Sequence, residues 1–185
     1  SSLSWLASFL CALFLVAVVA DAPMRDLARS LDTSVVSILR VVTQFGNSAW
    51  PLGLSLLLFA ALTIVSRTPN PFSPASLQNL RSALILMIGS VALSGAIASL
   101  TKNMIGRARP STGATAHVFD FAIMSFRAGW AAFPSGHATT AAACAIALSI
   151  ILPRLACAWL SIGLIAALSR SLLGVHWLTD CLAGI

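Results

Sequence analysis

Two short segments of the chain place a histidine where it could take part in nucleophilic or acid–base chemistry. In SRSLLGVHWLTD, Asp180 follows His176 by four residues, one turn of a helix, so its carboxylate can reach one imidazole nitrogen and leave the other free to attack. In FPSGHATT, Ser135 is suited to cap a helix, Gly136 admits a ligand close to the backbone amides, and His137 stands at the helix entrance. We therefore predict a nucleophile with its orienting carboxylate, and beside it an anion site that holds a second histidine.

Three basic residues accompany these segments. Lys102 and Arg109 stand seven residues apart in KNMIGRARP, and Arg170 precedes His176 by six residues. A bound phosphate monoester carries close to two negative charges, and these residues supply three positive charges with the forked donors of two guanidiniums. Each basic residue alone is compatible with a solvated surface charge. Together with the two histidines, the three favour phosphate as the ligand.

A metal site is the competing chemical interpretation. The His-x3-Asp spacing can ligate zinc, and His117 with Asp120 could supply further ligands. The sequence holds no HExxH motif and no acidic cluster for magnesium, and clustered Arg and Lys side chains would repel a divalent ion. We therefore predict neither a metal nor another cofactor, and assign His117 and Asp120 to loop structure or to the rim of the substrate site. Arg107 and Arg127 fit either a head-group contact or plain loop charges.

The elements that must position these residues are membrane helices. The chain of 185 residues is 58% hydrophobic and 9% charged, which argues against a water-soluble globule. Five apolar stretches approach the length that crosses a hydrocarbon core of about 30 Å as helix; they are Leu3–Ala20, Ala49–Val65, Ala83–Leu100, Ala138–Leu152 and Leu155–Leu168. A sixth begins at Trp177 and stops at Ile185. We predict an all-α, polytopic membrane helix bundle with six transmembrane helices, the sixth truncated, forming a single membrane-embedded domain over residues 1–185.

The first span has two interpretations. The ADA at residues 20–22 resembles a signal-peptidase site, but no basic region precedes the apolar run, and the run is long for a signal peptide. We expect a retained anchor helix. Because the chain opens with Ser1 rather than Met, we also expect further residues before it.

Three connections between the spans differ in character. Residues 22–48 carry apolar side chains at helical spacing, which fits a helix at the membrane interface or an amphipathic helix packed on the bundle. Residues 67–76 hold three prolines and form a loop. Residues 101–133 form the longest polar connection, and long ordered loops are often functional. If the spans alternate, the three reactive segments meet at one membrane face.

The charge balance points to an anionic partner. The net charge is +6 with no glutamate, which in a membrane protein suits lipid head groups or phosphorylated lipids. No Lys/Arg-rich run with interleaved aromatic residues occurs, so we predict no nucleic-acid binding. The four cysteines lie in or beside apolar spans without a C-x-x-C pair, and we interpret all of them as small packing residues; they are Cys11, Cys144, Cys157 and Cys181.

The three reactive segments together resemble the type 2 phosphatidic acid phosphatase family, whose pattern is K-x6-RP, then PSGH, then SR-x5-H-x3-D. The matching stretches agree at every fixed position and cover 25 residues; they are 102–110, 134–137 and 169–180. The family forms a six-helix membrane bundle, in agreement with the apolar spans. Soluble vanadium haloperoxidases share the same pocket, but five hydrophobic spans argue against that branch.

The resemblance implies a metal-independent phosphatase. By position, His176 would attack phosphorus and become phosphohistidine, Asp180 would hold its other nitrogen, and His137 would protonate the leaving oxygen before water releases phosphate. The phosphoryl oxygens would be bound by Lys102, Arg109, Ser135, the Gly136 amide and Arg170.

The resemblance also implies a site on the non-cytoplasmic face of the membrane. We place it on the periplasmic side of a bacterial inner membrane, since the chain is compact and lacks an N-x-S/T acceptor. A raw count of basic residues would make the same face cytoplasmic, but several of those residues belong to the predicted site. Consistent substrates are phosphatidate, phosphatidylglycerol phosphate, polyprenyl pyrophosphate and the 1-phosphate of lipid A, with the last three preferred for a bacterial protein.

Two alternatives stay open from the sequence. A lipid phosphotransferase would pass the phosphoryl group from the same phosphohistidine to a lipid acceptor instead of water. A non-catalytic lipid-phosphate transporter or binding module would keep the pocket only to hold phosphate. Against the transporter, the ionisable residues lie at span ends, and an intact nucleophile with its orienting carboxylate would be superfluous for binding.

Overall fold

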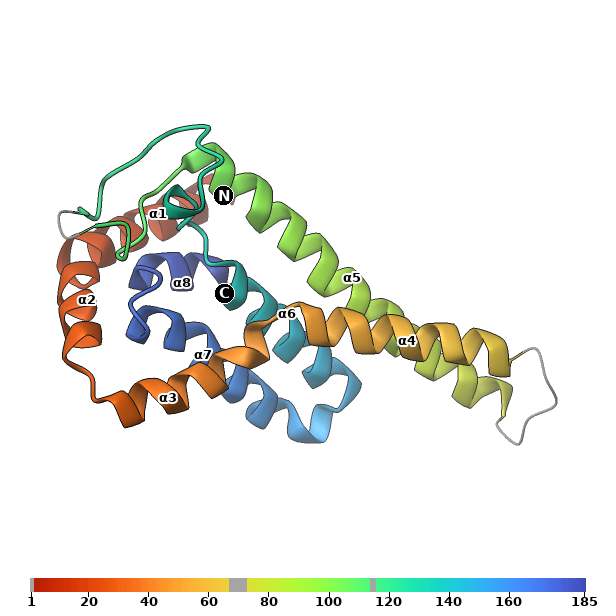
Figure 1. Ribbon diagram of the computed structural model, residues 1–185. Coiled ribbons are helices and arrows are strands. Elements are labelled where there is room, and N and C mark those ends of the chain that lie inside the picture. Colours follow the sequence, from red (N-terminus) through yellow and green to blue (C-terminus); the bar gives the residue numbers. More distant parts are fainter. Residues whose placement is uncertain (1, 67–72, 114–115) are drawn as a thin grey trace.

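The computed structural model describes residues 2–66, 73–113 and 116–185, and the secondary structure elements in these ranges are helices (Figure 1). In chain order they are α1 (Ser2–Val19), α2 (Asp21–Ser30), α3 (Thr33–Val42), the 3-10 turn η1 (Thr43–Gly46), α4 (Ala49–Val65), α5 (Pro74–Ile105), η2 (Ala128–Trp130), α6 (Gly136–Ile151), η3 (Pro153–Leu155), α7 (Ala156–Leu172) and α8 (Leu178–Gly184). The all-α prediction is confirmed.

Within the described ranges, three helical segments are long and apolar enough to cross a membrane: Thr33–Val65, Pro74–Ile105 and Pro153–Leu172. They contain the second, third and fifth predicted spans. Helices α1 and α2 pass the same test only together, with a bend of 46° between them, and α6 is apolar but has 16 residues. The chain is an integral membrane protein with three or four full-length spans on this criterion, and the count of six stays a prediction.

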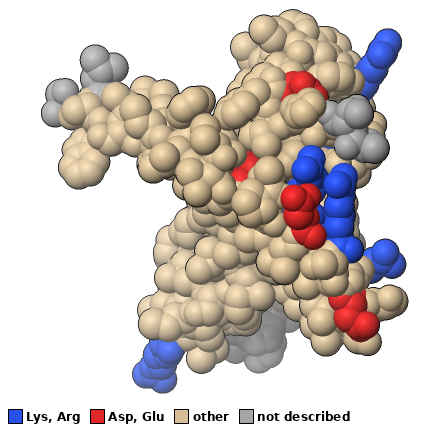
Figure 2. Space-filling model, turned by 90° about the vertical axis from the view of Figure 1, so that its left-hand side faces the viewer, with Lys and Arg blue, Asp and Glu red and all other residues tan. Residues whose placement is uncertain are grey.

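The surface agrees with a membrane setting. Many large apolar side chains on α1, α4, α5 and α7 are exposed, as expected for helices that face lipid. Figure 2 shows most of the charged side chains in that view gathered toward one side of the molecule, with broad uncharged areas elsewhere.

The region after α1 differs from its prediction. Residues 22–48 were expected to form one amphipathic helix, but α2 ends at Ser30 and α3 begins at Thr33. The break arises because the Asp32 side chain accepts a hydrogen bond from the Ser34 amide at 2.7 Å and so caps a new helix. Both α2 and α3 pack against α7, which favours the interpretation of helices packed on the bundle.

The two predicted loops are shorter than expected. Helix α5 begins at Pro74, with Ser73 as its cap, so the end of the predicted 67–76 loop is helical, and residues 67–72 lie outside the described part. At its other end α5 continues to Ile105, so the long loop begins at Gly106 rather than at Thr101. Gly106 has φ +63° and terminates the helix in the left-handed conformation that favours glycine.

Helix α6 forms the centre of the bundle and packs against both α5 and α7. Its small side chains let α7 approach closely, since a Cβ atom on Gly163 would lie only 2.5 Å from Cβ of Ala145. Cys144 and Cys181 are completely buried in the two core clusters, as predicted for packing residues, whereas Cys11 and Cys157 are exposed free thiols. The core therefore holds the start of α6 in a fixed place.

The conformation of Gly106 gives a stability prediction. Replacing it with alanine should destabilise the protein, because a positive φ costs an L-residue about 1–2 kcal/mol and the added Cβ would lie 1.8 Å from the Ala122 carbonyl oxygen. Thermal unfolding in detergent should show a lower midpoint for Gly106→Ala than for Gly89→Ala, a control in the same helix whose added Cβ meets nothing within 4 Å. Equal midpoints for the two variants would contradict this account of the helix end.

Candidate active site

Three helix ends meet at one end of the bundle: the end of α5, the start of α6 and the turn between α7 and α8 (Figure 1). Two hydrogen bonds join the segments that the sequence analysis singled out. The Ser135 amide donates to the Asp180 carbonyl oxygen at 2.9 Å, and the Trp177 indole donates to the Ala108 carbonyl oxygen at 2.8 Å. The three predicted segments therefore lie together.

His176 and Asp180 are paired, although not through the helical turn that the spacing suggested. Helix α8 begins at Leu178, so His176 precedes it, and Asp180 bends back to accept the Trp177 amide at 2.8 Å. The same carboxylate oxygen, Oδ2, lies 3.5 Å from Nδ1 of His176, an ion-pair separation slightly too long for a hydrogen bond. The other imidazole nitrogen, Nε2, is left free for chemistry.

The environment of His176 favours its neutral form. Burial lowers the pKa of this imidazole, while Asp180 opposes the shift and the nearby cations Arg109 and Arg170 add to it. The side chain is 4% exposed, so burial dominates. A neutral imidazole carries the lone pair that nucleophilic attack requires.

Arg109 and Arg170 are partly buried and have hydrogen-bond donors to spare. Nη2 of Arg109 makes a long contact of 3.5 Å to the Ala131 carbonyl oxygen, and Nη1 of Arg170 reaches Oγ1 of Thr43 at 3.4 Å. In the described part of the protein, Nε of each guanidinium is buried without a hydrogen-bond partner. Burial also lowers the pKa of Arg109. Such donors suit an anion that would complete their hydrogen bonds.

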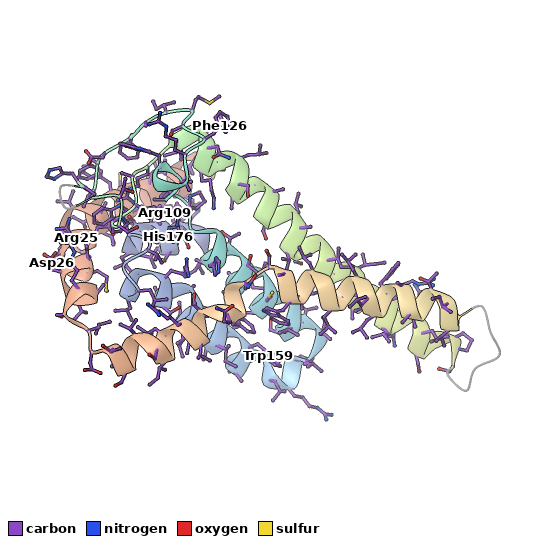
Figure 3. The ribbon with its side chains drawn as sticks, viewed as in Figure 1. Arg25, Asp26, Arg109, Phe126, Trp159 and His176 are labelled. Atoms are coloured by element: carbon purple, nitrogen blue, oxygen red, sulfur yellow. The ribbon has the colours of Figure 1, made fainter. Side chains whose placement is uncertain are left out.

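Lys102 lies over the start of α6. A Cβ atom built on Gly136 would lie 3.0 Å from Nζ of Lys102, so glycine leaves the room that the ammonium group occupies. Lys102 sits in the last turn of α5, within electrostatic reach of Arg109 and Arg170. The three predicted cations therefore surround the helix entrance. Figure 3 shows two of the site residues, Arg109 in the loop after α5 and His176 between α7 and α8.

The start of α6 has the predicted cap. Ser135 precedes the helix, and its hydroxyl oxygen accepts from the Ala138 amide at 3.4 Å. His137 follows in the first turn, within electrostatic reach of His176 and the three cations. Turn η1 closes on it so tightly that a Cβ on Gly46 would lie 2.4 Å from the His137 carbonyl oxygen. His137 is thus held in place at the start of α6, within electrostatic reach of His176 and of the three cations.

A cavity of about 320 Å³ opens beside His137. Its lining mixes small, polar and apolar side chains from η1, α4, α5 and α6 and the turn before α4; it includes Asn47, Ser48, Leu52, Val91, Gly95, Ser99, Gly136, His137 and Thr140. The cavity is large enough for part of a substrate on the side of the site that carries His137.

A buried ion-pair network that was not predicted from the sequence lies next to Asp180. Nη1 of Arg107 donates to Oδ1 of Asp180 at 2.6 Å, and Nη2 donates to Oδ2 of Asp21 at 2.7 Å. Arg107 also donates to Thr179 Oγ1 at 2.7 Å and to the Val118 carbonyl oxygen at 3.0 Å. Arg107 is 4% exposed and both aspartates are fully buried. The two carboxylates share one guanidinium, which leaves this trio one negative charge in excess.

The contacts of Asp21 with Thr179 and of Trp177 with two arginines were also not predicted from the sequence. Asp21 accepts from both the backbone amide and the hydroxyl of Thr179, at 2.9 and 2.5 Å, and the Trp177 ring lies against Arg25 and Arg107. A partial signal for Arg107 was its position between the two basic residues of the recognised pattern, Lys102 and Arg109. There was no such signal for Asp21, because that residue reaches the site only through tertiary packing.

His117 and Asp120, the two further candidates for metal ligands, have a structural role instead. Asp120 accepts the His117 amide at 2.8 Å, so the pair stabilises a turn of the loop, one of the two roles expected for it. In the described ranges no group of three His, Cys, Asp or Glu side chains is arranged to hold a metal ion. Arg127 is exposed, and the structure gives it no contact with the site.

A family model described as the PAP2 superfamily matches residues 83–185, more than half of the chain. The chain belongs to the PAP2 superfamily. This confirms the resemblance, and together with two curated relatives that are named as phosphatases it shows that the chain is a phosphatase. All the predicted site residues fall inside the matched region, whereas Asp21 lies outside it.

Two curated PAP2-like relatives are each called lipid A 1-phosphatase. The protein from Rhizobium etli is 30% identical over 170 residues, which cover 89% of this chain and 71% of the relative. The protein from Rhizobium johnstonii is 31% identical, with 89% and 67% covered. A solved structure, described as the first transmembrane PAP2 type phosphatidylglycerolphosphate phosphatase from Bacillus subtilis, matches with a TM-score of 0.60 at 22% identity, covering 96% of this chain and 87% of that one. At that identity the likeness concerns the PAP2 fold.

The Arg107 network gives a first prediction for this PAP2 protein. Arg107→Gln should lower activity strongly and reduce stability by about 3–5 kcal/mol, because two buried carboxylates lose their shared counter-ion. Arg127→Gln, an exposed charge in the same loop, should change neither. Phosphate release and thermal unfolding in detergent measure both effects, and an active, stable Arg107→Gln protein would refute the role of the network.

The lowered pKa of His176 gives a second prediction. Since protonation removes the nucleophilic lone pair, activity should persist as the pH falls to the ordinary histidine value of 6.5 and be lost only below it. In Asp180→Asn the residual activity should persist to still lower pH, because the carboxylate that raises the pKa is gone. The pH dependence of kcat/KM for both proteins, with the same substrate, tests this shift. Movement of the acid limb to higher pH in Asp180→Asn would contradict it.

Proposed function

We propose that the protein hydrolyses a phosphomonoester of a membrane lipid through a phosphohistidine at His176. The observation that carries this proposal is the pairing of the buried His176 with Asp180, near three cations of which Arg109 and Arg170 each keep a buried donor without a hydrogen-bond partner in the described part of the protein. A nucleophile and an anion cradle at one place are what phosphoryl transfer requires. The proposed site residues are those expected from the sequence, with Arg107 and Asp21 added as positioning residues.

In the first step Nε2 of His176 attacks phosphorus and the bond to the lipid oxygen breaks. Lys102, Arg109 and Arg170 stabilise the charge on the phosphoryl oxygens, together with Ser135 and the Gly136 amide. The dianion in turn offsets the cations around His137 and favours its protonated form, which donates its proton to the leaving oxygen.

In the second step water attacks the phosphohistidine, giving its proton to His137, and the P–N bond breaks to release phosphate. The phosphorylated imidazole carries positive charge in the intermediate. The excess negative charge of the Asp21–Arg107–Asp180 trio lies directly behind it and stabilises that charge.

The proposed substrate is the 1-phosphate of lipid A. Both curated relatives are named for that activity, and they are 30% and 31% identical to this chain over 170 residues. Phosphatidylglycerol phosphate is less favoured, since that likeness is one of fold. Polyprenyl pyrophosphate and phosphatidate complete the panel of lipids to be compared. The half-polar cavity beside His137 suits a leaving group with a polar head and an apolar continuation.

The setting is proposed along with the reaction. We propose a single membrane-embedded domain of six helices in a bacterial inner membrane, with the site facing the periplasm. Several of the basic residues on the site's face belong to the proposed site, so their count does not fix the orientation by the usual charge rule.

The proposal predicts a defined loss of turnover. His176→Ala should lower phosphate release on the order of 10⁴-fold or more, and His137→Ala by about 10²–10⁴-fold. His117→Ala is the matched control, because that exposed side chain has no role in the site. Purified protein would be assayed with each lipid in EDTA, since no step needs a metal.

Three outcomes of this assay bear on the alternatives. Label from a phosphate donor that appears on a second lipid would favour a phosphotransferase over a hydrolase. Binding of lipid phosphate without release, and without a phosphorylated His176, would favour a transporter. Release from none of the lipids would refute the proposed function.

A further inference from the structure

The long loop after α5 exposes an unusual set of apolar side chains near the candidate site. We define the loop patch as Phe119, Phe121, Ile123, Met124 and Phe126, which are 49–78% exposed. Figure 3 shows Phe126 at the outer edge of this loop. A loop of a membrane protein that faced water would be expected to carry polar residues there.

The backbone presents these side chains outward. Phe119, Phe121 and Ile123 alternate with residues whose backbone groups pair with the segment after α5, since Ala108 donates to Asp120 and Gly106 accepts from Ala122, at 2.9 and 2.7 Å.

The tip of the loop is a turn closed by a hydrogen bond from Ser125 to the Ala122 carbonyl oxygen at 3.0 Å. Its two central residues are Ile123 and Met124, and Met124 has φ +60°. Glycine or asparagine is usual at such a position, so an apolar residue at this tip indicates a role for the side chain.

The loop patch is continuous with surfaces that face lipid. The Phe119 ring lies 5.8 Å from that of Phe14, an exposed residue of α1, and the two flank an apolar groove of about 310 Å³ between α1 and the loop. On the other side, the Met124 amide donates to the carbonyl oxygen of Met104, a 60% exposed residue in the last turn of α5. Exposed apolar residues of α1 and α5 therefore adjoin those of the loop.

We propose that the loop patch inserts into the lipid leaflet that adjoins the candidate active site. Continuity with α1 and α5 favours lipid over a protein partner as the occupant. The exposed Arg127 directly after the patch can remain at the level of anionic head groups, an arrangement typical of interfacial segments.

Insertion of the loop would fix the depth of the active site relative to the lipid head groups. The loop pairs through its backbone with residues 106–108, which carry Arg107 and lead into Arg109. An inserted loop therefore holds the phosphate-binding cations at the depth where a lipid phosphate lies. This consequence rests on the proposed function, whereas insertion itself does not.

Depth can be measured with a fluorophore. Phe126→Cys, in a background with Cys11→Ala and Cys157→Ala that leaves only the buried Cys144 and Cys181, would carry a polarity-sensitive label in vesicles that contain anionic phospholipid. The label should be quenched by lipids with a shallow acyl-chain quencher and shielded from iodide by about tenfold relative to Ser111→Cys, an exposed polar position in the same loop. Equal iodide quenching at both positions, or quenching only after self-association or addition of another protein, would overturn the proposal.

Activity gives an independent readout. The double variant Met124→Asn, Phe126→Ser keeps a residue tolerant of positive φ at the turn and removes two apolar side chains. Its kcat/KM for lipid phosphate in vesicles should fall about tenfold, because less apolar surface enters the leaflet, while a short-chain, water-soluble phosphomonoester should be cleaved as before. Leu155→Ser, an exposed apolar position at the opposite end of the bundle, is the control.

The outcomes separate the two proposals. Equal loss with both substrates would assign the loop a structural role and overturn insertion. Unchanged activity on vesicles would overturn its contribution to substrate access. Absence of turnover in the unaltered protein would count against the proposed function, and the fluorescence result would still decide insertion.

Discussion

The guanidinium of Arg107, enclosed between two buried carboxylates, is the interaction on which the site geometry depends. Burying three charged groups is costly unless each finds a close partner, and here the contacts to Asp21 and Asp180 are 2.7 and 2.6 Å. The network fixes Asp180, and Asp180 in turn orients His176 and accepts the Ser135 amide. A change at this guanidinium would therefore be transmitted to both His176 and the helix that carries His137.

The site divides into two electrostatic halves. On one side the Asp21–Arg107–Asp180 trio holds two carboxylates and one guanidinium, and Asp180 faces Nδ1 of His176. On the other side the cations Lys102, Arg109 and Arg170 form no ion pair with an acidic side chain among the described residues, and Nε of each arginine is buried without a hydrogen-bond partner there. Negative charge behind His176 and positive charge in front of it would match the charge changes of the proposed phosphoryl transfer to an imidazole.

Much of this arrangement could be predicted from local sequence. The cap at Ser135 and the grouping of Lys102, Arg109 and Arg170 follow from short-range patterns that the fold preserves. The four-residue spacing also predicted that Asp180 would lie beside His176. The two are paired, but because Asp180 bends back at the start of α8 and not because they share a helical turn. The break at Asp32 was missed because a capping side chain overrode a continuous apolar stripe. Asp21 could not be found, because its role arises from packing between residues 158 positions apart.

The same long separation has a consequence for how activity arises during folding. Asp21 lies at the junction of α1 and α2, and Thr179 and Asp180 lie at the start of α8. The contacts that join them therefore form only when α8 packs beside this junction. A partly assembled bundle could contain every membrane helix between them and still leave Arg107 with only one of its two carboxylate partners. Phosphatase activity would then appear only after these contacts form, so an incompletely folded molecule would not dephosphorylate lipid.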